Sequence, residues 1–393
     1  MTDATRGTTA RDAGMQEEMA EATRLTRAGR LSEATALIQR SLGGGVSPDA
    51  FTSPTQTPPR DAFSLPISLP DTLPGNGLPP VLQPPVFEPG PLRTPEPDAP
   101  STAGRFVAGS YTGRAGTRAY KLYVPSGAGE RDLPLVVMLH GCTQSADDLA
   151  AGTRMNELAE GGPFFVVYPE QSAKANGQKC WNWFKAGDQR RDAGEPSLIA
   201  GITRQVAATQ PVDARRVYVA GMSAGGAMAV VMGATYPELY AAVGVHSGLA
   251  YGAAHDMPSA FTAMKGGAPD PTPGKTRAAG TAGAVDLARS VPTIVFHGDR
   301  DGTVHPRNGE QVLHQWADGA GRATVRQGQV SGGRAYTRSV YRDAGGEHVA
   351  ERWIVHGAGH AWSGGSPRGS YTDPGGPDAS AEMVRFFLEH PRG

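Results

Sequence analysis

Short apolar runs of strand length alternate with helical stretches along the chain from Arg105 onward. The apolar runs are Phe106–Tyr111, Arg118–Val124, Leu135–Leu139, Phe164–Tyr168, Val217–Ala220, Ala242–His246, Thr293–His297 and Trp353–Val355. Helical stretches lie between them, for example Ala146–Glu160 and Leu198–Thr209. Unbroken apolar runs are typical of strands buried on both faces, and strands that alternate with helices predict a mostly parallel sheet. The pattern therefore predicts an α/β fold with helices on both faces of the sheet and a ligand site at the carboxyl ends of the strands.

The N-terminal segment has a different periodicity. One apolar stripe at helical spacing runs from Met15 to Leu25 and a second from Leu31 to Leu42, with Gly29 between them. This pattern predicts a helical hairpin over residues 1–45, although a marginally ordered tail is the alternative. A single hairpin cannot bury its own apolar faces. We therefore expect residues 12–42 to dock on the main domain, to self-associate, or to dock on a granule or another protein.

Proline-rich sequence separates this hairpin from the α/β segment. Residues 46–104 are rich in Pro, Ser, Thr and Gly and have neither helical nor strand periodicity. Such a composition is typical of an extended linker. The sequence thus predicts a hairpin at 1–45, a linker at 46–104 and a catalytic domain at 105–393.

Composition excludes several classes of protein. With 37 basic and 38 acidic residues the formal net charge is −1, so the chain lacks the basic character of a nucleic-acid-binding protein. No apolar run approaches the ~18 residues of a membrane span, and the N-terminus lacks the ~7–15-residue apolar core of a signal peptide. We therefore expect a cytoplasmic protein that does not cross the membrane. The two cysteines are too few for a disulfide-rich scaffold or a four-cysteine metal site, and the chemistry below requires no metal or cofactor.

The segment from Val217 to Gly226 carries the clearest chemical signal. A β-branched run enters the sequence Gly-Met-Ser-Ala-Gly at 221–225, and small residues of helical character follow it. This strand–turn–helix context is that of a nucleophile elbow, with Ser223 exposed on a tight turn. The N–H of Ala224, at the start of the helix, would then donate to an oxyanion. The alternative is a chance match in a chain with 53 glycines.

A second oxyanion donor is expected on the loop after the strand Leu135–Leu139. His140, Gly141 and Cys142 follow that strand directly. In this architecture the loop there supplies a backbone donor, which we assign to the N–H of Cys142. An ordinary strand exit that contains glycine is the alternative.

An acid and a base are expected after the serine in chain order. Asp301 and Asp299 both follow the strand Thr293–His297, and we prefer Asp301 as the acid because it lies on the turn itself. A surface turn without a catalytic role is the alternative for both carboxylates. His360 lies beyond the last predicted strand between small residues and is our choice for the base, while His356 is the competitor with a structural role.

Aromatic residues near these positions are candidates for the substrate pocket. Trp181, Asn182, Trp183 and Phe184 are consecutive, and Trp362 lies two residues after His360. Binding pockets are mostly apolar with a few polar groups, so this set can line the site for the acyl or alcohol group. Packing in the core explains the aromatic residues equally well.

Taken in order, these motifs resemble those of the polyhydroxybutyrate depolymerase-type esterases, which include feruloyl and acetylxylan esterases. The resemblance covers about Arg105 to Leu388. It is carried by Leu139–Gln144, Tyr168–Gln171, Cys180–Phe184, Gly221–Gly226, His297–Asp301 and Gly359–Trp362.

The family resemblance implies an α/β-hydrolase fold and a set of roles. Ser223 is implied as the nucleophile, Asp301 as the acid, His360 as the base and Cys142 as part of the oxyanion hole. It also implies a Cys142–Cys180 disulfide in secreted members, and an extracellular location as the alternative to the cytoplasm. The expected substrate is a polyester or oligomer of 3-hydroxybutyrate, with feruloyl or acetylxylan esters second. A non-catalytic binding or scaffold protein is the alternative of another class, which an intact Ser/Asp/His set disfavours.

Overall fold

The computed structural model describes residues 104–393, apart from residue 130 and the segments 269–290 and 317–320. The predicted hairpin at 1–45 and nearly all of the predicted linker at 46–104 lie outside the described residues. Both therefore stay predictions.

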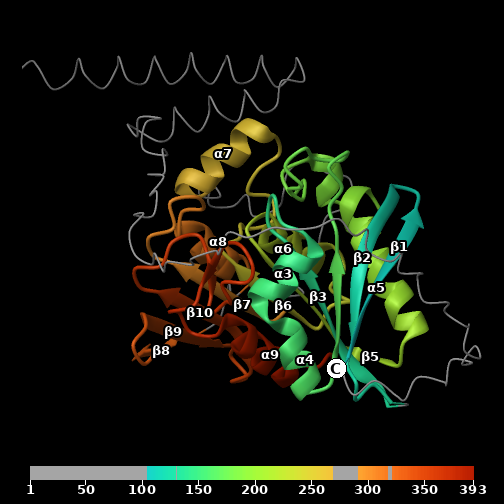
Figure 1. Ribbon diagram of the computed structural model, residues 1–393. Coiled ribbons are helices and arrows are strands. Elements are labelled where there is room, and N and C mark those ends of the chain that lie inside the picture. Colours follow the sequence, from blue (N-terminus) through green and yellow to red (C-terminus); the bar gives the residue numbers. More distant parts are fainter. Residues whose placement is uncertain (1–103, 130, 269–290, 317–320) are drawn as a thin grey trace, which may run out of the picture. The chain divides into compact units, whose positions relative to one another are not determined.

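One large sheet organises the described part of the chain (Figure 1). Its strands, in spatial order, are β1 (Arg105–Gly113), β2 (Gly116–Val124), β4 (Phe165–Pro169), β3 (Leu133–Leu139), β5 (Val212–Met222), β6 (Ala242–His246), β7 (Thr293–Gly298), β10 (His348–Val355), β9 (Ala335–Arg342) and β8 (Thr324–Gln329). The six strands from β4 to β10 in this order are parallel, and antiparallel strands complete both edges. Every residue of β3, β4, β6 and β7 is buried, as their apolar runs predict.

Helices cover both faces of this sheet (Figure 1). Side chains of α3 (Ala146–Thr153), α4 (Met155–Gly161) and α9 (Ala379–Glu389) share one core with one face. Those of α5 (Gly194–Thr209), α6 (Ala224–Thr235), α7 (Met257–Gly266) and α8 (Arg307–Trp316) share a second core with the opposite face. A short 3-10 helix, η2 (Ala186–Gln189), and a two-stranded parallel pair, β11 (Trp362–Ser363) and β12 (Thr372–Asp373), complete the described elements. The predicted α/β class is confirmed.

The predicted helix at Ala146–Glu160 is in fact two helices. The helical path is interrupted at Arg154, which adopts a left-handed φ of 55° between α3 and α4. The Arg154 guanidinium donates to Asp378 at 2.8 Å, at the start of α9. This long-range contact stabilises a bend that helical periodicity does not reveal.

Strands β8 and β9 were not predicted. Most β8 side chains are exposed, and those of β9 are mainly partly buried. Because they form an edge of the sheet, their sequence lacks the apolar run by which buried strands are recognised.

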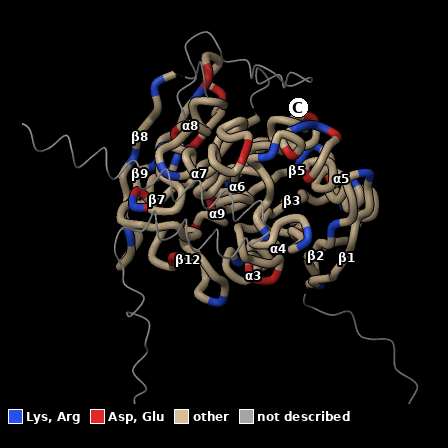
Figure 2. The backbone as a smooth tube through the Cα atoms, turned by 90° about the horizontal axis from the view of Figure 1, so that it is seen from above, with Lys and Arg blue, Asp and Glu red and all other residues tan. Residues whose placement is uncertain are grey.

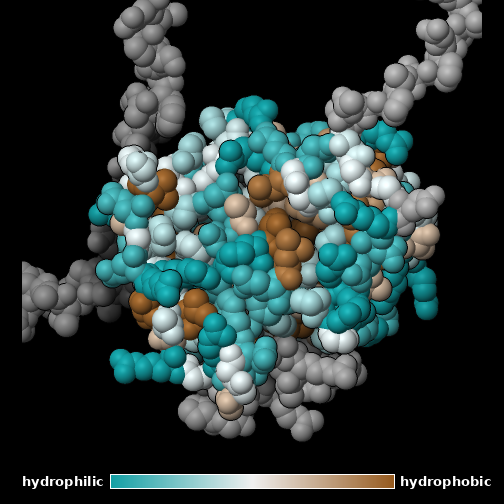
Figure 3. Space-filling view, turned by 90° about the horizontal axis from the view of Figure 1, so that it is seen from below, coloured by the Kyte–Doolittle hydropathy of each residue, from teal (hydrophilic) through white to brown (hydrophobic). Residues whose placement is uncertain are grey.

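Figures 2 and 3 show how charge and hydropathy are distributed in two views of the described residues. Seen from above, basic and acidic residues are intermingled along the backbone (Figure 2). Seen from below, the surface is largely hydrophilic and hydrophilic side chains interrupt its hydrophobic areas (Figure 3). None of the described helices has the length and apolar character needed to cross a membrane.

Candidate active site

The predicted site residues follow the carboxyl ends of four parallel strands. Cys142 follows β3, Ser223 follows β5, Asp301 follows β7 and His360 follows β10. Parallel strands end at one edge of a sheet, so these positions share the edge at which ligands bind in α/β folds. Ser223, Cys142 and His360 are partly exposed there, whereas Asp301 is buried.

Ser223 lies on a strained turn between β5 and α6. It has φ 56° and ψ −120°, a positive φ that a residue with a side chain rarely adopts. Its N–H donates to the carbonyl of His246 at 2.9 Å, which ties the turn to the end of β6. Gly225 leaves the room for this turn, because an added Cβ would lie 2.0 Å from the carbonyl oxygen of Leu139. Ala224 begins α6, so its N–H has no partner within the helix and is available to an oxyanion.

A short hydrogen bond joins His360 to Asp301. The Nδ1–H of His360 donates to Oδ2 of Asp301 at 2.7 Å. The other carboxylate oxygen, Oδ1, accepts from the backbone N–H groups of Thr303 at 2.9 Å and Val304 at 2.8 Å. Burial alone would raise the pKa of Asp301, but hydrogen bonds from His297, His360 and Val304 outweigh it and hold the pKa well below its usual range. An ionised Asp301 keeps the His360 proton on Nδ1, and this leaves Nε2 free to accept one.

The competing residues form a pair of their own. Asp299 accepts from Nδ1 of His356 at 2.9 Å and from the backbone N–H of Gly357 at 2.7 Å. Nε2 of His356 lies 2.9 Å from the hydroxyl of Thr337 on β9. Both nitrogens of the His356 ring therefore have partners. This favours a structural role, in which His356 and Asp299 connect the ends of β7 and β10 with β9.

The loop after β3 lies beside Ser223. A Cβ built on Gly141 would lie 3.5 Å from the Cβ of Ser223, which places the next residue, Cys142, near the Ser223 turn. The N–H of Gly141 donates to Oε1 of Gln144 at 2.9 Å and so closes the loop on itself.

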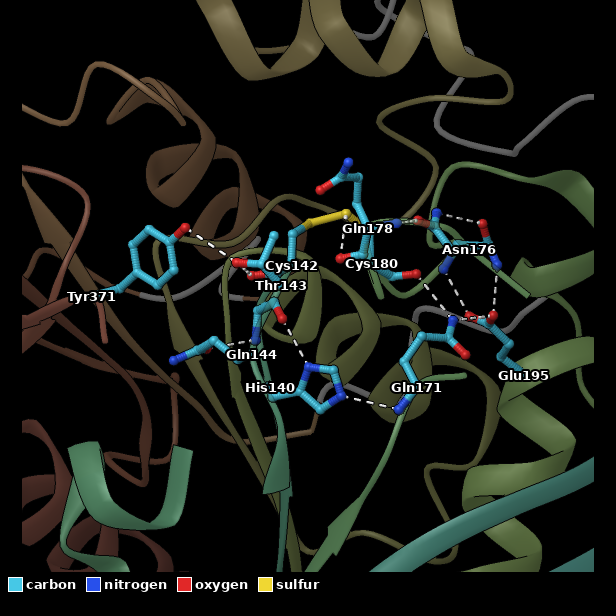
Figure 4. The surroundings of a disulfide bond; sticks show 12 residues. His140, Cys142, Thr143, Gln144, Gln171, Asn176, Gln178, Cys180, Glu195 and Tyr371 are labelled. Atoms are coloured by element: carbon cyan, nitrogen blue, oxygen red, sulfur yellow. Dashed lines mark hydrogen bonds between the residues drawn. A yellow bond between two sulfur atoms is a disulfide. The ribbon is translucent and has the colours of Figure 1, made fainter. Parts of the chain in front are cut away.

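A disulfide joins Cys142 to Cys180 (Figure 4). The N–H of Thr143 donates to the carbonyl of Gln178 at 2.7 Å, so backbone contacts accompany the bridge. The hydroxyl of Tyr371 lies 3.2 Å from that of Thr143. Covalent and hydrogen-bonded contacts together hold the loop that carries Cys142.

Reducing this disulfide is expected to destabilise the protein by roughly 3–4 kcal/mol, because the bridge closes a loop with a sequence separation of 38. Chemical denaturation with and without dithiothreitol measures the difference. The double variant Cys142→Ser/Cys180→Ser is the control and should not respond to the reductant. Two alkylatable thiols in protein purified under oxidising conditions would contradict the bridge.

The aromatic candidates lie inside the core. Trp181 is 0% exposed and Trp362 is 1% exposed, and the Trp362 indole donates to Ser380 at 3.0 Å. Trp183 and Phe184 are also buried and pack edge to face. For these residues the structure favours the core-packing alternative over direct contact with a ligand.

Asn182 is engaged by a buried carboxylate. Its backbone N–H and its side-chain amide donate to the two oxygens of Glu195, at 2.7 Å and 2.6 Å. Asn182 thus connects its loop to α5 and presents little surface, since it is 3% exposed.

Two buried histidines next to the site were not singled out from the sequence. His297 donates through Nε2 to the carbonyl of Val304 at 2.8 Å, and the same nitrogen lies 3.4 Å from Asp301. His246 accepts at Nε2 from the N–H of Ser363 at 2.9 Å, while its own carbonyl accepts from Ser223. Burial lowers the pKa of His246 to about 3, so its ring is neutral. The available signal was that each of these two histidines is the last residue of a predicted strand, Ala242–His246 or Thr293–His297.

One group of metal-ligating side chains occurs in the described part of the chain, away from these residues. His348, Glu351 and Glu389 lie at the amino end of β10 and on α9. Arg338 and Arg385 both donate to Glu351, and their positive charges oppose the binding of a cation. The donor set therefore fits an ion-pair network better than a metal site.

Comparisons with known proteins identify relatives of this chain. The family model for esterase PHB depolymerase matches residues 118–335, a segment that contains Cys142, Ser223 and Asp301. Poly(3-hydroxyalkanoate) depolymerase C of Paucimonas lemoignei is 36% identical over 255 residues, which are 64% of this chain and 58% of that protein. The chain thus spans less than two thirds of that relative.

Two other comparisons concern a feruloyl esterase and an acetyl xylan esterase. Feruloyl esterase B of Neurospora crassa is 31% identical over 223 residues, which are 53% of this chain and 73% of that protein. The solved structure of an acetyl xylan esterase from Aspergillus awamori has a TM-score of 0.56 at 20% identity, and the match covers 72% of this chain and 99% of that one. At this identity the similarity shows the fold, which is that of an α/β-hydrolase.

Proposed function

Because this chain belongs to the esterase PHB depolymerase family, we propose that it is a serine esterase that cleaves carboxylic esters through Ser223, His360 and Asp301. The bond from His360 Nδ1 to Asp301, at 2.7 Å, is the observation that carries the proposal. It leaves the imidazole in the tautomer that a general base requires.

The reaction proceeds by two acyl transfers. His360 takes the proton of Ser223 as the serine oxygen attacks the ester carbonyl, and the N–H groups of Cys142 and Ala224 stabilise the resulting oxyanion. The protonated His360 then gives its proton to the leaving alcohol. It next activates a water molecule, which releases the acid and restores the serine.

The preferred substrate is a polymer or oligomer of 3-hydroxybutyrate. The 36% identity to a poly(3-hydroxyalkanoate) depolymerase supports this choice, compared with 31% for a feruloyl esterase. A feruloyl or acetylxylan ester is the second candidate, supported by relatives with those names. The mostly buried aromatic candidates give no reason to prefer either substrate.

We expect the enzyme to hydrolyse p-nitrophenyl butyrate, and to hydrolyse 3-hydroxybutyrate oligomers with a higher kcat/KM than methyl ferulate or acetylated xylan. The first assay separates an enzyme from a binding protein on the same fold. The second ranks the two substrate classes, with the Ser223→Ala variant as the blank. A higher kcat/KM on methyl ferulate or acetylated xylan would reverse the substrate choice.

The remaining sequence predictions concern residues 1–104 and the location of the protein. Self-association or granule docking through residues 12–42 stays a prediction, and tethering would raise the local concentration of the catalytic domain at an insoluble polyester. The cytoplasmic location, with secretion as the alternative, also stays a prediction.

A further inference from the structure

His140 lies between the loop that carries Cys142 and the loop after β4 (Figure 4). Its ring is 0% exposed. The backbone N–H of Gln171 donates to Nε2 of His140 at 3.0 Å. Since Nε2 accepts, the proton of the neutral ring is on Nδ1, which donates to the carbonyl of Gly141 at 2.7 Å. Burial lowers the pKa of His140 to about 4, so this neutral form persists at neutral pH.

The carbonyl that His140 holds belongs to the same peptide group as the N–H of Cys142. A peptide group is planar, and in the trans form its C=O and N–H point in opposite directions. The described residues contain no cis peptide bond. Holding the Gly141 oxygen therefore also determines the direction of the Cys142 N–H.

We propose that His140 is a positioning residue that orients the Cys142 N–H toward the oxyanion by holding the carbonyl of Gly141. The inference rests on the proposed function, because it needs an oxyanion formed at Ser223. The disulfide attaches through the Cys142 side chain and does not bind this carbonyl. The Gly141 carbonyl also accepts from the backbone N–H of Gln144, but at 3.4 Å this bond is longer than the 2.7 Å bond from His140.

The partner of His140 is itself held in place. The side-chain amide of Gln171 donates to Oε1 of Glu195 at 2.5 Å and to the carbonyl of Cys180 at 3.0 Å. Glu195 is buried at the first turn of α5. The backbone N–H of Gln171, which sets the tautomer of His140, therefore belongs to a residue whose side chain is bound to α5.

Two substitutions test the two hydrogen bonds of the His140 ring one at a time, because each removes a different bond. In His140→Asn the amide nitrogen can take the place of Nδ1 and donate to Gly141, while the bond from Gln171 is lost. In His140→Gln the amide oxygen can reach the place of Nε2 and accept from Gln171, while the bond to Gly141 is lost. Each variant removes one buried hydrogen bond, so both should unfold at similarly reduced denaturant concentrations.

We expect kcat on p-nitrophenyl butyrate to fall about 10–100-fold in His140→Gln, less than the ~10²–10³-fold that loss of a whole oxyanion donor costs. KM should change little, because the oxyanion forms only after binding. His140→Asn should stay within about fivefold of wild type, and a trifluoromethyl ketone should lose affinity for His140→Gln by about the factor by which kcat falls. His348→Gln, at the amino end of β10, is the control for loss of an imidazole and should keep its kcat.

Unchanged kcat in His140→Gln, or equal losses in both His140 variants, would overturn this inference while the wild-type enzyme remains active. A fall in kcat without weaker binding of the ketone would also overturn it. Absence of ester turnover in the wild type would instead overturn the proposed function, and this inference with it.

Discussion

Replacing Ser223 with alanine is expected to lower ester turnover on the order of 10⁶-fold. The substitution removes the only atom of the proposed site that bonds to the acyl group, and the remaining oxyanion donors retain a small residual rate. The fold should persist, because Ser223 is tied to β6 through its backbone N–H, which alanine also has. Steady-state kinetics on p-nitrophenyl butyrate measure the loss.

Covalent labelling provides the matching control. A serine-directed phosphonate should modify wild-type protein at Ser223, as located by peptide mass spectrometry, and should not modify the variant. Circular dichroism should give the same spectrum for both proteins. Retention of about a tenth of the wild-type activity would exclude Ser223 as the nucleophile, since true nucleophile variants lose far more.

Changing Asp301 to asparagine is expected to lower kcat about 10⁴-fold, because the imidazole would hold its proton on the wrong nitrogen. The backbone N–H groups of Thr303 and Val304 both donate to Oδ1. They require an oxygen there, so the asparagine nitrogen would have to occupy the position of Oδ2, opposite His360. A donor there turns Nδ1 of His360 into an acceptor and moves the proton to Nε2, which could then no longer accept the proton of Ser223.

Asp299→Asn is the control for Asp301→Asn, because it makes the same chemical change two residues away. It disturbs the contacts of Asp299 with His356 and Gly357, not the pair of Asp301 and His360, so kcat should stay within about threefold of wild type, well under the tenfold that 1.4 kcal/mol represents. Parallel kinetic assays of the two variants decide between the carboxylates. A larger loss in Asp299→Asn would transfer the role of the acid to Asp299.

The edge of the sheet at which the proposed site residues lie could be predicted from the sequence. The preferences for Asp301 over Asp299 and for His360 over His356 could not be decided from the sequence. Ser223 and Cys142 each follow an apolar run. In an α/β fold the carboxyl ends of such parallel strands lie at the same edge of the sheet. Asp299 and Asp301, and likewise His356 and His360, lie on single short loops. Which carboxylate meets which imidazole depends on side-chain directions that only the three-dimensional structure reveals.

Burial and tautomers were equally inaccessible from the sequence. An aromatic residue near a catalytic motif has the same sequence signal whether it lines a pocket, as predicted for Trp362, or packs in the core, as observed. The tautomer of His140 depends on a backbone N–H from a different loop, that of Gln171. Both are long-range properties, as is the break at Arg154.

The strand order also has a consequence for biosynthesis. The first four strands along the chain lie together at one side of the ten-stranded sheet, and β5, β6 and β7 then add to them in the order of their synthesis. Cys142 follows β3 and Cys180 follows β4, so both belong to this first part of the chain. At about 5–20 residues per second, roughly 10–40 s separate the synthesis of Cys180 from that of His360. A nascent chain therefore contains both cysteines well before it contains all of the proposed catalytic residues, so the disulfide can form before the proposed active site is complete.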